Sequence, residues 1–485
     1  MNDDRPNILF FMTDQEQAQV IMPGHPCRTP NAERLIAEGV NFTRAFTPMA
    51  HCCPSRASLM TGMYPSKHGI FNNVQNTAAI HLSLNPGCET WSEKLRDASY
   101  SLAFAGKWHV SATEDPSDRG WEELDPITAT GTYGRYDSEK YLEMPRQDDR
   151  PRGRGEVLQP GYGRWRAYGS TEAAVEDLSD YKVVRAGIAK MKELAAKDSP
   201  WCVYMGTGGP HAPFVIPEEY AHMYDPADVE LPPNYNDDMS TRPRLYERMQ
   251  KKYRQLTEDE IREAIAHYWG YCTMIDEWLG EVLDELEATG QAENTLVIFC
   301  SDHGEFCGAH GLFAKGIAPF DEAYRVPYVM RWPKGIKDPG REVSSFITHC
   351  DISPTMTELA LARPTQDPSG RSLVPFLRGE TPPDWPDAFC NQCNGVEIYY
   401  TQRMVRTEKW KLVHNPVDMD ELYDLENDPH EMENLAEKPE LQPVLRELFG
   451  KLWTKARAER DYMSPYHTCS HAPFGPAFAL GKAPD

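Results

Sequence analysis

The sequence has no apolar run long enough to cross a membrane. Its first apolar stretch, residues 8–12, follows a polar and acidic segment, and polar residues come directly after it. A membrane helix needs about 20 apolar residues, and a signal peptide needs a basic flank and an apolar core of about 7–15. We therefore expect a cytoplasmic protein with no membrane partner.

Cysteine is too sparse for a protein held together by disulfides. The chain has 12 cysteines in 485 residues, and Cys202 and Cys300 are among several that lie inside apolar stretches. Such cysteines are typical of buried free thiols in a reducing compartment. Cys390 and Cys393 form one CxxC pair, but no second pair or nearby histidines complete a zinc site. We interpret them as ordinary thiols.

Basic residues are outnumbered by acidic ones. Lysine and arginine total 50, aspartate and glutamate total 74, and the net charge is −24. This charge repels nucleic acid and gives no general attraction to an anionic substrate. Any anion-binding site must therefore be a local pocket of basic side chains.

Apolar runs that alternate with helical patterns predict the fold class. The clearest runs are residues 8–12, 101–105, 201–205 and 296–300. Between the last two, Thr257 and Glu260 form a capping box ahead of an amphipathic pattern that continues to Leu283. The alternation predicts an α/β protein with a large, mostly parallel sheet sandwiched by helices.

The length of the chain predicts more than one domain. Glycine and proline become frequent around residues 370–383, and alternating patterns at 403–407 and 410–413 predict a hairpin. We predict a large domain at residues 1–380, a smaller C-terminal α+β subdomain on a short antiparallel sheet at 381–460, and a tail at 461–485.

Two segments have patterns that do not define their folds. Residues 114–169 are rich in Gly, Pro, Arg and Tyr with little periodicity, which predicts a long functional excursion. We expect substrate selectivity to lie there and in residues 217–252. Two interpretations of the tail stay open: a loosely packed surface chain, or a segment that reaches a neighbouring subunit of a homo-oligomer.

Chemically reactive side chains follow the strand-like runs. They are Asp14, Lys107, His109, His211, Asp302 and His303. Because ligands gather at the carboxyl ends of the strands in α/β sheets, we expect these side chains to converge on one site.

The sharpest motif begins at His51-Cys52-Cys53-Pro54-Ser55-Arg56 and ends at Thr61-Gly62. It resembles the sulfatase signature, CxPSR followed by a short helix and Thr-Gly. The resemblance implies that a formylglycine-generating enzyme oxidises Cys52 to formylglycine (3-oxoalanine), and that Arg56 holds the hydrated aldehyde. One hydroxyl of that hydrate attacks sulfur, and the other releases sulfate. Alone, Cys-Cys-Pro-Ser-Arg would also fit a helix start with two buried thiols.

A second set of residues resembles the divalent-metal site of the same family. Asp14-Gln15 and Asp302-His303 stand where many sulfatases carry Asp-Asp and Asp-Asn with calcium. With Cys52 as formylglycine, the resemblance implies one cation held by all five residues. Gln15 and His303 depart from the usual pattern and make the site less anionic and softer, so both Ca²⁺ and Mn²⁺ stay open. A single Asp after a strand is by itself typical of a cap.

Three further segments resemble the GKWH, PHxPF and HGLxxK segments of sulfatases. They are Gly106-Lys107-Trp108-His109, residues 210–214, and His310-Gly311-Leu312 with Lys315. The resemblance implies that Lys107 and Lys315 contact the sulfate group, His109 orients or deprotonates the nucleophile, His211 protonates the leaving oxygen, and His310 binds substrate. Each of these residues alone would be an ordinary surface lysine or core histidine.

The resemblance covers about residues 6–440 and implies an alkaline-phosphatase-like fold. It implies hydrolysis of sulfate monoesters of a small molecule or a carbohydrate. Phosphonate monoester hydrolases and phosphodiesterases of the same superfamily are the alternative, because Gln15, His303 and the segment with Asn76, a candidate substrate-binding residue, resemble that branch. Lys107 and His109 favour a sulfatase. A non-catalytic protein that binds sulfated ligands would have lost some of these positions, and none is missing.

Overall fold

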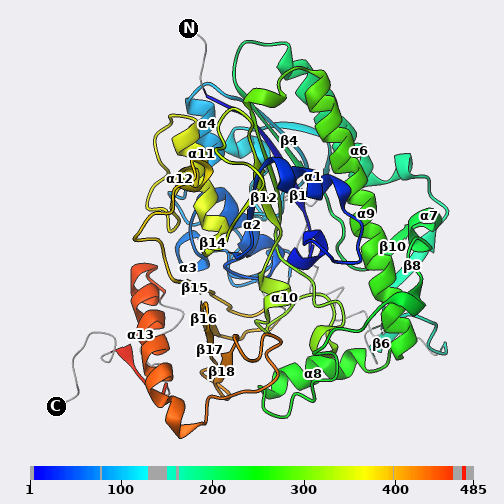
Figure 1. Ribbon diagram of the computed structural model, residues 1–485, viewed down its shortest axis with the longest axis vertical. Helices are drawn as coiled ribbons and strands as arrows, with labels where there is room; N and C mark the ends of the chain where they lie inside the picture. Colours follow the sequence, from blue (N-terminus) through cyan, green and yellow to red (C-terminus); the bar gives the residue numbers. More distant parts are fainter. Residues whose placement is uncertain are drawn as a thin grey trace.

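The centre of the molecule is a sheet flanked by helices (Figure 1). The computed structural model describes residues 5–76, 79–128, 150–159, 163–396, 398–461 and 472–476. Within these residues the main sheet has eight strands in the order β13-β2-β12-β11-β1-β9-β4-β5. Their bounds are β1 (Asn7–Thr13), β2 (Val40–Phe42), β4 (Ser101–Lys107), β5 (Glu122–Thr128), β9 (Trp201–Gly206), β11 (Thr295–Ser301), β12 (Tyr328–Arg331) and β13 (Arg341–Val343).

The sheet is parallel where the predicted strands lie. β1 pairs in parallel with β9 and β11, and β4 pairs in parallel with β9, whereas β12 is antiparallel to both of its neighbours. The four apolar runs expected to be strands correspond to β1, β4, β9 and β11. The α/β prediction is therefore confirmed, and the carboxyl ends of these four strands meet at one edge.

Each face of the sheet is buried under its own layer of helices. Along β1, Leu9 and Phe11 pack into one core, while Phe10 and Met12 pack into the other. This double burial explains why the strands are continuous apolar runs. Helices α1 (Pro30–Glu38), α6 (Ser179–Ala195) and α9 (Glu258–Ala288) cover the first face, and α2 (Cys52–Thr61), α4 (Trp91–Asp97) and α11 (Ile352–Leu359) cover the second (Figure 1).

Helix α9 begins where the capping box predicts. The Glu260 backbone N–H donates to Thr257 Oγ1 at 3.3 Å, and the Thr257 backbone N–H donates to Glu260 Oε2 at 2.8 Å. The helix runs for 31 residues and carries charged and polar side chains on its outer face. Among the helices of the described ranges, none is both long and apolar enough to cross a bilayer.

A small antiparallel sheet lies toward the C-terminus, as the alternating pattern predicts. It contains β15 (Ala388–Cys390), β16 (Arg403–Thr407), β17 (Trp410–His414) and β18 (Glu421–Asp424), in that order. Val405 and Leu412 pack against α13 (Gln442–Ala458), whereas Met404 and Val413 pack into the core of the large sheet. The small sheet is thus attached to the rest of the molecule through one of its faces.

Part of the predicted tail also packs on α13. Trp453 Nε1 donates to the Phe474 carbonyl oxygen at 2.7 Å, and the Phe474 ring lies 6.1 Å from that of Phe449. Residues 462–471 and 477–485 lie outside the described residues. The hypothesis that the tail reaches a neighbouring subunit therefore stays untested.

The predicted excursion at residues 114–169 contains more regular structure than its sequence indicates. β5 is the edge strand of the main sheet, next to β4, and β6 (Glu156–Gln159) pairs with β7 (Gly163–Arg166). The acidic residues and proline of β5 hide it from an apolar pattern, but both suit an edge strand. Residues 129–149 and 160–162 of this segment lie outside the described part of the chain.

The remaining helices and strands are short or peripheral. They are β3 (Ala45–Phe46), β8 (Tyr168–Thr171), β10 (Phe214–Pro217), β14 (Ile347–Thr348), α3 (Pro65–His68), α7 (Glu218–Ala221), α8 (Arg244–Tyr253), α10 (Asp321–Tyr324) and α12 (Val374–Leu377).

Gly106 precedes Lys107 at the carboxyl end of β4, and both its backbone conformation and its surroundings require glycine. Its φ is +91°, and a Cβ atom there would lie 2.0 Å from the Gly206 carbonyl oxygen on β9. Exposed Gly87 has a similar φ of +85°, but nothing lies within 4 Å of its Cβ position. The two glycines share the backbone requirement and differ in the space around them.

We therefore expect Gly106→Ala to lower the thermal unfolding midpoint much more than Gly87→Ala does. The left-handed backbone costs about 1–2 kcal/mol in either variant. Overpacking between β4 and β9 adds about 1–3 kcal/mol in the first alone. Thermal unfolding followed by circular dichroism measures the difference, and equal midpoints would show that the β4–β9 contact tolerates a methyl group.

Candidate functional site

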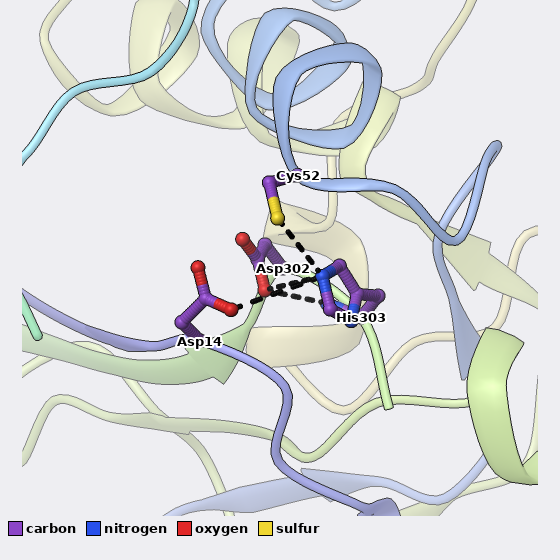
Figure 2. A group of neighbouring side chains, drawn as sticks. All are labelled: Asp14, Cys52, Asp302 and His303. Atoms are coloured by element: carbon purple, nitrogen blue, oxygen red, sulfur yellow. Dashed lines mark hydrogen bonds and ion pairs between the residues drawn. The ribbon is translucent and has the colours of Figure 1, made fainter. Parts of the chain in front are cut away.

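Four side chains meet at the strand-end edge of the sheet (Figure 2). Asp14 follows β1, Asp302 and His303 follow β11, and Cys52 is the first residue of α2. One potential ligand atom from each lies within 4.8 Å of the others, and all four residues are buried. Cys52 Sγ is 3.3 Å from His303 Nε2. The structure thus brings together residues that are far apart in the sequence.

The donors of this cluster fit a divalent cation. His303 Nδ1 donates to the Gly304 carbonyl oxygen at 2.9 Å, so the Nε2 lone pair faces the cluster. That atom is 3.8 Å from Asp14 Oδ1 and 3.6 Å from Asp302 Oδ1. Asp14 Oδ1 is buried and has no hydrogen-bond partner, which is rare for a carboxylate oxygen. Two carboxylates and one imidazole suit Mn²⁺ and accommodate Ca²⁺.

Arg56 binds the strand ends rather than Cys52. Its Nε donates to Asp302 Oδ2 at 2.8 Å, its Nη2 donates to Asp14 Oδ2 at 3.3 Å, and its Nη1 donates to the Lys107 carbonyl oxygen at 2.7 Å. The side chain is 1% exposed. Lys107 Nζ also donates to Asp14 Oδ2. Arg56 therefore ties α2 to the ends of β1, β4 and β11 and balances the charge of both carboxylates.

The positive groups around Cys52 and Asp14 outweigh the effect of burial on both. Burial raises the pKa of the Cys52 thiol, but Lys107 and Lys315 hold that pKa well below its usual range. Burial and the neighbouring Cys52 also raise the pKa of Asp14, yet Lys107 lowers it below the ordinary value. Lys107 and Lys315 therefore place positive charge beside Cys52 in a protein of net charge −24, as an anion site requires.

Two more of the predicted basic residues, Lys315 and His211, contact each other beside Gln15. Lys315 Nζ is 2.6 Å from Gln15 Oε1 and 2.6 Å from His211 Nε2. His211 Nδ1 donates to the Ala212 carbonyl oxygen at 2.6 Å, so Nε2 accepts from the ammonium group. The lysine, the amide and the imidazole thus form a chain that starts beside Asp14.

His109 lies beside the nucleophile position and is held from behind by an amide. Its Nε2 donates to Gln75 Oε1 at 2.6 Å, and its buried Nδ1 has no hydrogen-bond partner among the described residues. Burial and the nearby Lys107 lower the pKa of His109 to about 4, so the ring is neutral at pH 7. A neutral imidazole suits the role of a hydrogen-bond partner or base.

His310 and Asn76 do not join this cluster through the contacts that the structure gives them. His310 Nδ1 bonds Asp237 Oδ2 at 2.8 Å, and its ring stacks on Phe320 at 3.5 Å. The adjacent Gly311 lines a separate cavity of about 270 Å³. Asn76 donates its backbone N–H to the Asn73 carbonyl oxygen at 3.1 Å.

Sequence motifs missed three polar residues that support the site. Gln75 contacts His109, and Asn73 Oδ1 accepts the Cys53 backbone N–H at 2.9 Å at the start of α2. Glu305 accepts a hydrogen bond from the Gln15 side chain. Glu305 stands in the segment Asp302-His303-Gly304-Glu305, but spacing alone gave it no role. Gln75 directly precedes Asn76, which the sequence had indicated as a candidate substrate-binding residue.

Two family models match the chain, and curated relatives match it over most of its length. The family model described as "Sulfatase" matches residues 6–362, and that described as "N-sulphoglucosamine sulphohydrolase, C-terminal" matches residues 308–458. The sulfatase YidJ of Escherichia coli strain K12 is 29% identical over 482 residues, 95% of this chain and 89% of that protein. An N-acetylglucosamine-6-O-sulfatase of Bacteroides thetaiotaomicron is 26% identical over 528 residues, 94% of this chain and 87% of that protein.

A solved structure shares the fold over nearly the whole length. The phosphonate monoester hydrolase SpPMH from Silicibacter pomeroyi superposes with a TM-score of 0.77 at 24% sequence identity, and the match covers 95% of this chain and 97% of that chain.

Proposed function

Because the chain belongs to the sulfatase family, a family of sulfuric ester hydrolases, we propose that it hydrolyses sulfate monoesters with residue 52 as the nucleophile. The observation that carries the proposal is the convergence of Asp14, Cys52, Asp302 and His303, with Lys107 and Lys315 close by. This site offers a nucleophile position, a place for a cation and positive charge for the sulfuryl oxygens.

We propose that Asp14, Asp302, His303 and residue 52 hold one divalent cation, Ca²⁺ or Mn²⁺. The Gln15 side chain, predicted as a further ligand, instead bonds Glu305 and Lys315. When bound, the cation would supply Lewis-acid polarisation of a sulfate oxygen. The unpartnered Asp14 Oδ1 and the inward Nε2 of His303 support this assignment. Arg56 fixes the two carboxylates in place, because it donates to both of them.

Each basic residue is proposed to interact with a different part of the reacting sulfate ester. Lys107 and Lys315 neutralise the sulfuryl oxygens. His109, which is neutral at pH 7, accepts a hydrogen bond from the nucleophile. His211 protonates the leaving oxygen from its imidazolium form: Nε2 gives its proton to that oxygen, and in the resulting neutral ring Nε2 accepts from Lys315 while the Nδ1 bond to Ala212 fixes the ring.

Maturation of the site requires a partner. The proposal includes oxidation of Cys52 to formylglycine by a formylglycine-generating enzyme, which would replace the thiol with a hydrated aldehyde carrying two hydroxyls. Cys52 is 1% exposed in the folded chain. We therefore propose that the modifying enzyme acts before α2 packs onto the sheet.

The proposed substrate class is a sulfated carbohydrate. The related protein from Bacteroides thetaiotaomicron is named for a sugar sulfate, and the match covers 94% of this chain. The second candidate activity is hydrolysis of phosphonate monoesters. Gln15 and His303 favour it, together with the structural likeness to SpPMH. Because sulfate and phosphonate esters share tetrahedral geometry, we expect the second activity as a side reaction.

The proposal is tested by mass spectrometry of the peptide around Cys52, together with turnover of p-nitrophenyl sulfate and a p-nitrophenyl phosphonate monoester. We expect an aldehyde in place of the thiol and faster turnover of the sulfate. Faster turnover of the phosphonate would favour the second candidate. An intact thiol in protein from cells that carry the modifying enzyme, without turnover of either ester, would contradict both candidates.

The role of His211 is tested with aryl sulfates whose leaving groups increase in basicity. p-Nitrophenolate leaves without a proton, so His211→Asn should lower its release only slightly. Basic leaving groups need the proton, and we expect a loss of about 10²–10⁴-fold for them. Steady-state kcat/KM across the series measures the effect. A uniform loss for all leaving groups would exclude His211 as the acid.

A further inference from the structure

Glu305 is a buried carboxylate to which the proposed chemistry assigns no role. Its side chain has no exposed surface. One oxygen, Oε2, accepts from Gln15 Nε2. The other, Oε1, accepts from the backbone N–H of Cys307 at 3.0 Å and from that of Ala314. All three donors belong to segments that border the site, since Gln15 follows Asp14 and Ala314 precedes Lys315.

The three partners of Glu305 share an unusual backbone conformation. Gln15 has a φ of +71°, Cys307 of +47° and Ala314 of +62°. None is glycine, and non-glycine residues avoid this left-handed region because of a clash with Cβ. Such residues persist only where the surroundings hold them in place, and they cluster at functional sites. Here one carboxylate accepts a hydrogen bond from each of the three.

The chemistry of the neighbours fixes which way the Gln15 amide faces. An ammonium group only donates hydrogen bonds, so the oxygen of the Gln15 amide must face Lys315, and the NH₂ group is left to donate to Glu305. Gln15 therefore presents Nε2 to Glu305 and Oε1 to Lys315 Nζ, 2.6 Å away. The same Nζ lies 2.6 Å from His211 Nε2. The orientation of one amide thus decides whether Lys315 is held in the pocket or repelled from it.

We propose that Glu305 is a positioning residue for catalysis. It orients the Gln15 amide so that its oxygen holds Lys315, and it anchors the loop from residue 306 to 314 that delivers Lys315. The inference rests on the proposed function, because it gives Lys315 the sulfuryl group as its target.

Reciprocal substitutions test the amide orientation. In Glu305→Gln, the new Oε1 still accepts from the Cys307 and Ala314 N–H groups, so the new Nε2 faces Gln15. Gln15 then turns its own NH₂ group toward Lys315. In Gln15→Glu, two carboxylates face each other. In the double variant, the amide introduced at position 305 donates to the carboxylate introduced at position 15. The second oxygen of that carboxylate again accepts from Lys315.

The measurements are kcat/KM for p-nitrophenyl sulfate and the thermal unfolding midpoint, on full-length proteins with matched aldehyde content at residue 52. We expect each single variant to lose about 10–100-fold in kcat/KM. The double variant should return to within about threefold of the wild type and unfold at a higher temperature than either single variant. Glu421→Gln is the matched control, because Glu421 is a buried carboxylate bonded to Tyr246 and Tyr423 in the small sheet. It should lower the midpoint without changing kcat/KM.

A Glu305→Gln enzyme with wild-type kcat/KM would overturn the inference. So would a double variant that fails to fold or is no better than the single variants. If the wild type turns over no sulfate ester, the proposed function fails. The unfolding midpoints of the four proteins then still test the contact between Glu305 and Gln15, because coupling in stability does not depend on turnover.

Discussion

The site depends on a balance of buried charges at the carboxyl ends of the strands. Asp14 and Asp302 have no exposed side-chain surface, and burying an ionised carboxylate is costly unless it is paired and hydrogen-bonded. Arg56 donates to both, and Lys107 donates to Asp14. Because Arg56 lies one turn into α2, the same interaction that balances the carboxylates also fixes Cys52 beside them. The hydrogen bonds of Arg56 thus both compensate the charge of the carboxylates and place residue 52 beside them.

The small sheet forms ion pairs with α10, which in turn contacts the segment that carries His303. Arg406 Nη2 and Lys411 Nζ, on neighbouring strands, each lie 2.9 Å from a carboxylate oxygen of Asp321 on α10. In turn, the Ala323 carbonyl oxygen accepts the Gly304 backbone N–H at 2.8 Å, next to His303. Ion pairs to buried partners resist solvent and salt better than exposed ones. These contacts therefore connect the small sheet to the segment that carries His303.

The sequence predicts what local patterns encode. Continuous apolar runs identify β1, β4, β9 and β11, since both faces of those strands are buried, and the capping box at Thr257 identifies the start of α9. β5 escaped prediction because an edge strand tolerates charged residues and proline. The motif segments also predicted most of the side chains that meet in the pocket. Arg56 was assigned to the hydrated aldehyde, but its hydrogen bonds go to groups 42 to 246 positions away, which no spacing within the motif encodes.

Gln75 and Glu305 were missed for a similar reason. Their roles follow from loop backbones and from partners distant in sequence, as with Gln15, 290 positions from Glu305. His310 is the opposite case. It belongs to a motif, but the structure gives it a hydrogen bond with Asp237 and ring stacking on Phe320. The individual roles of the site residues stay predictions until they are tested by substitution.

If Asp14, Asp302, His303 and residue 52 surround one divalent cation, crystals of the full-length protein grown with Mn²⁺ should show it by anomalous diffraction. We expect one anomalous peak at about 2.0–2.6 Å from oxygen or nitrogen atoms of these residues. A map with no peak at this cluster, or with the bound metal held by other residues, would contradict this expectation.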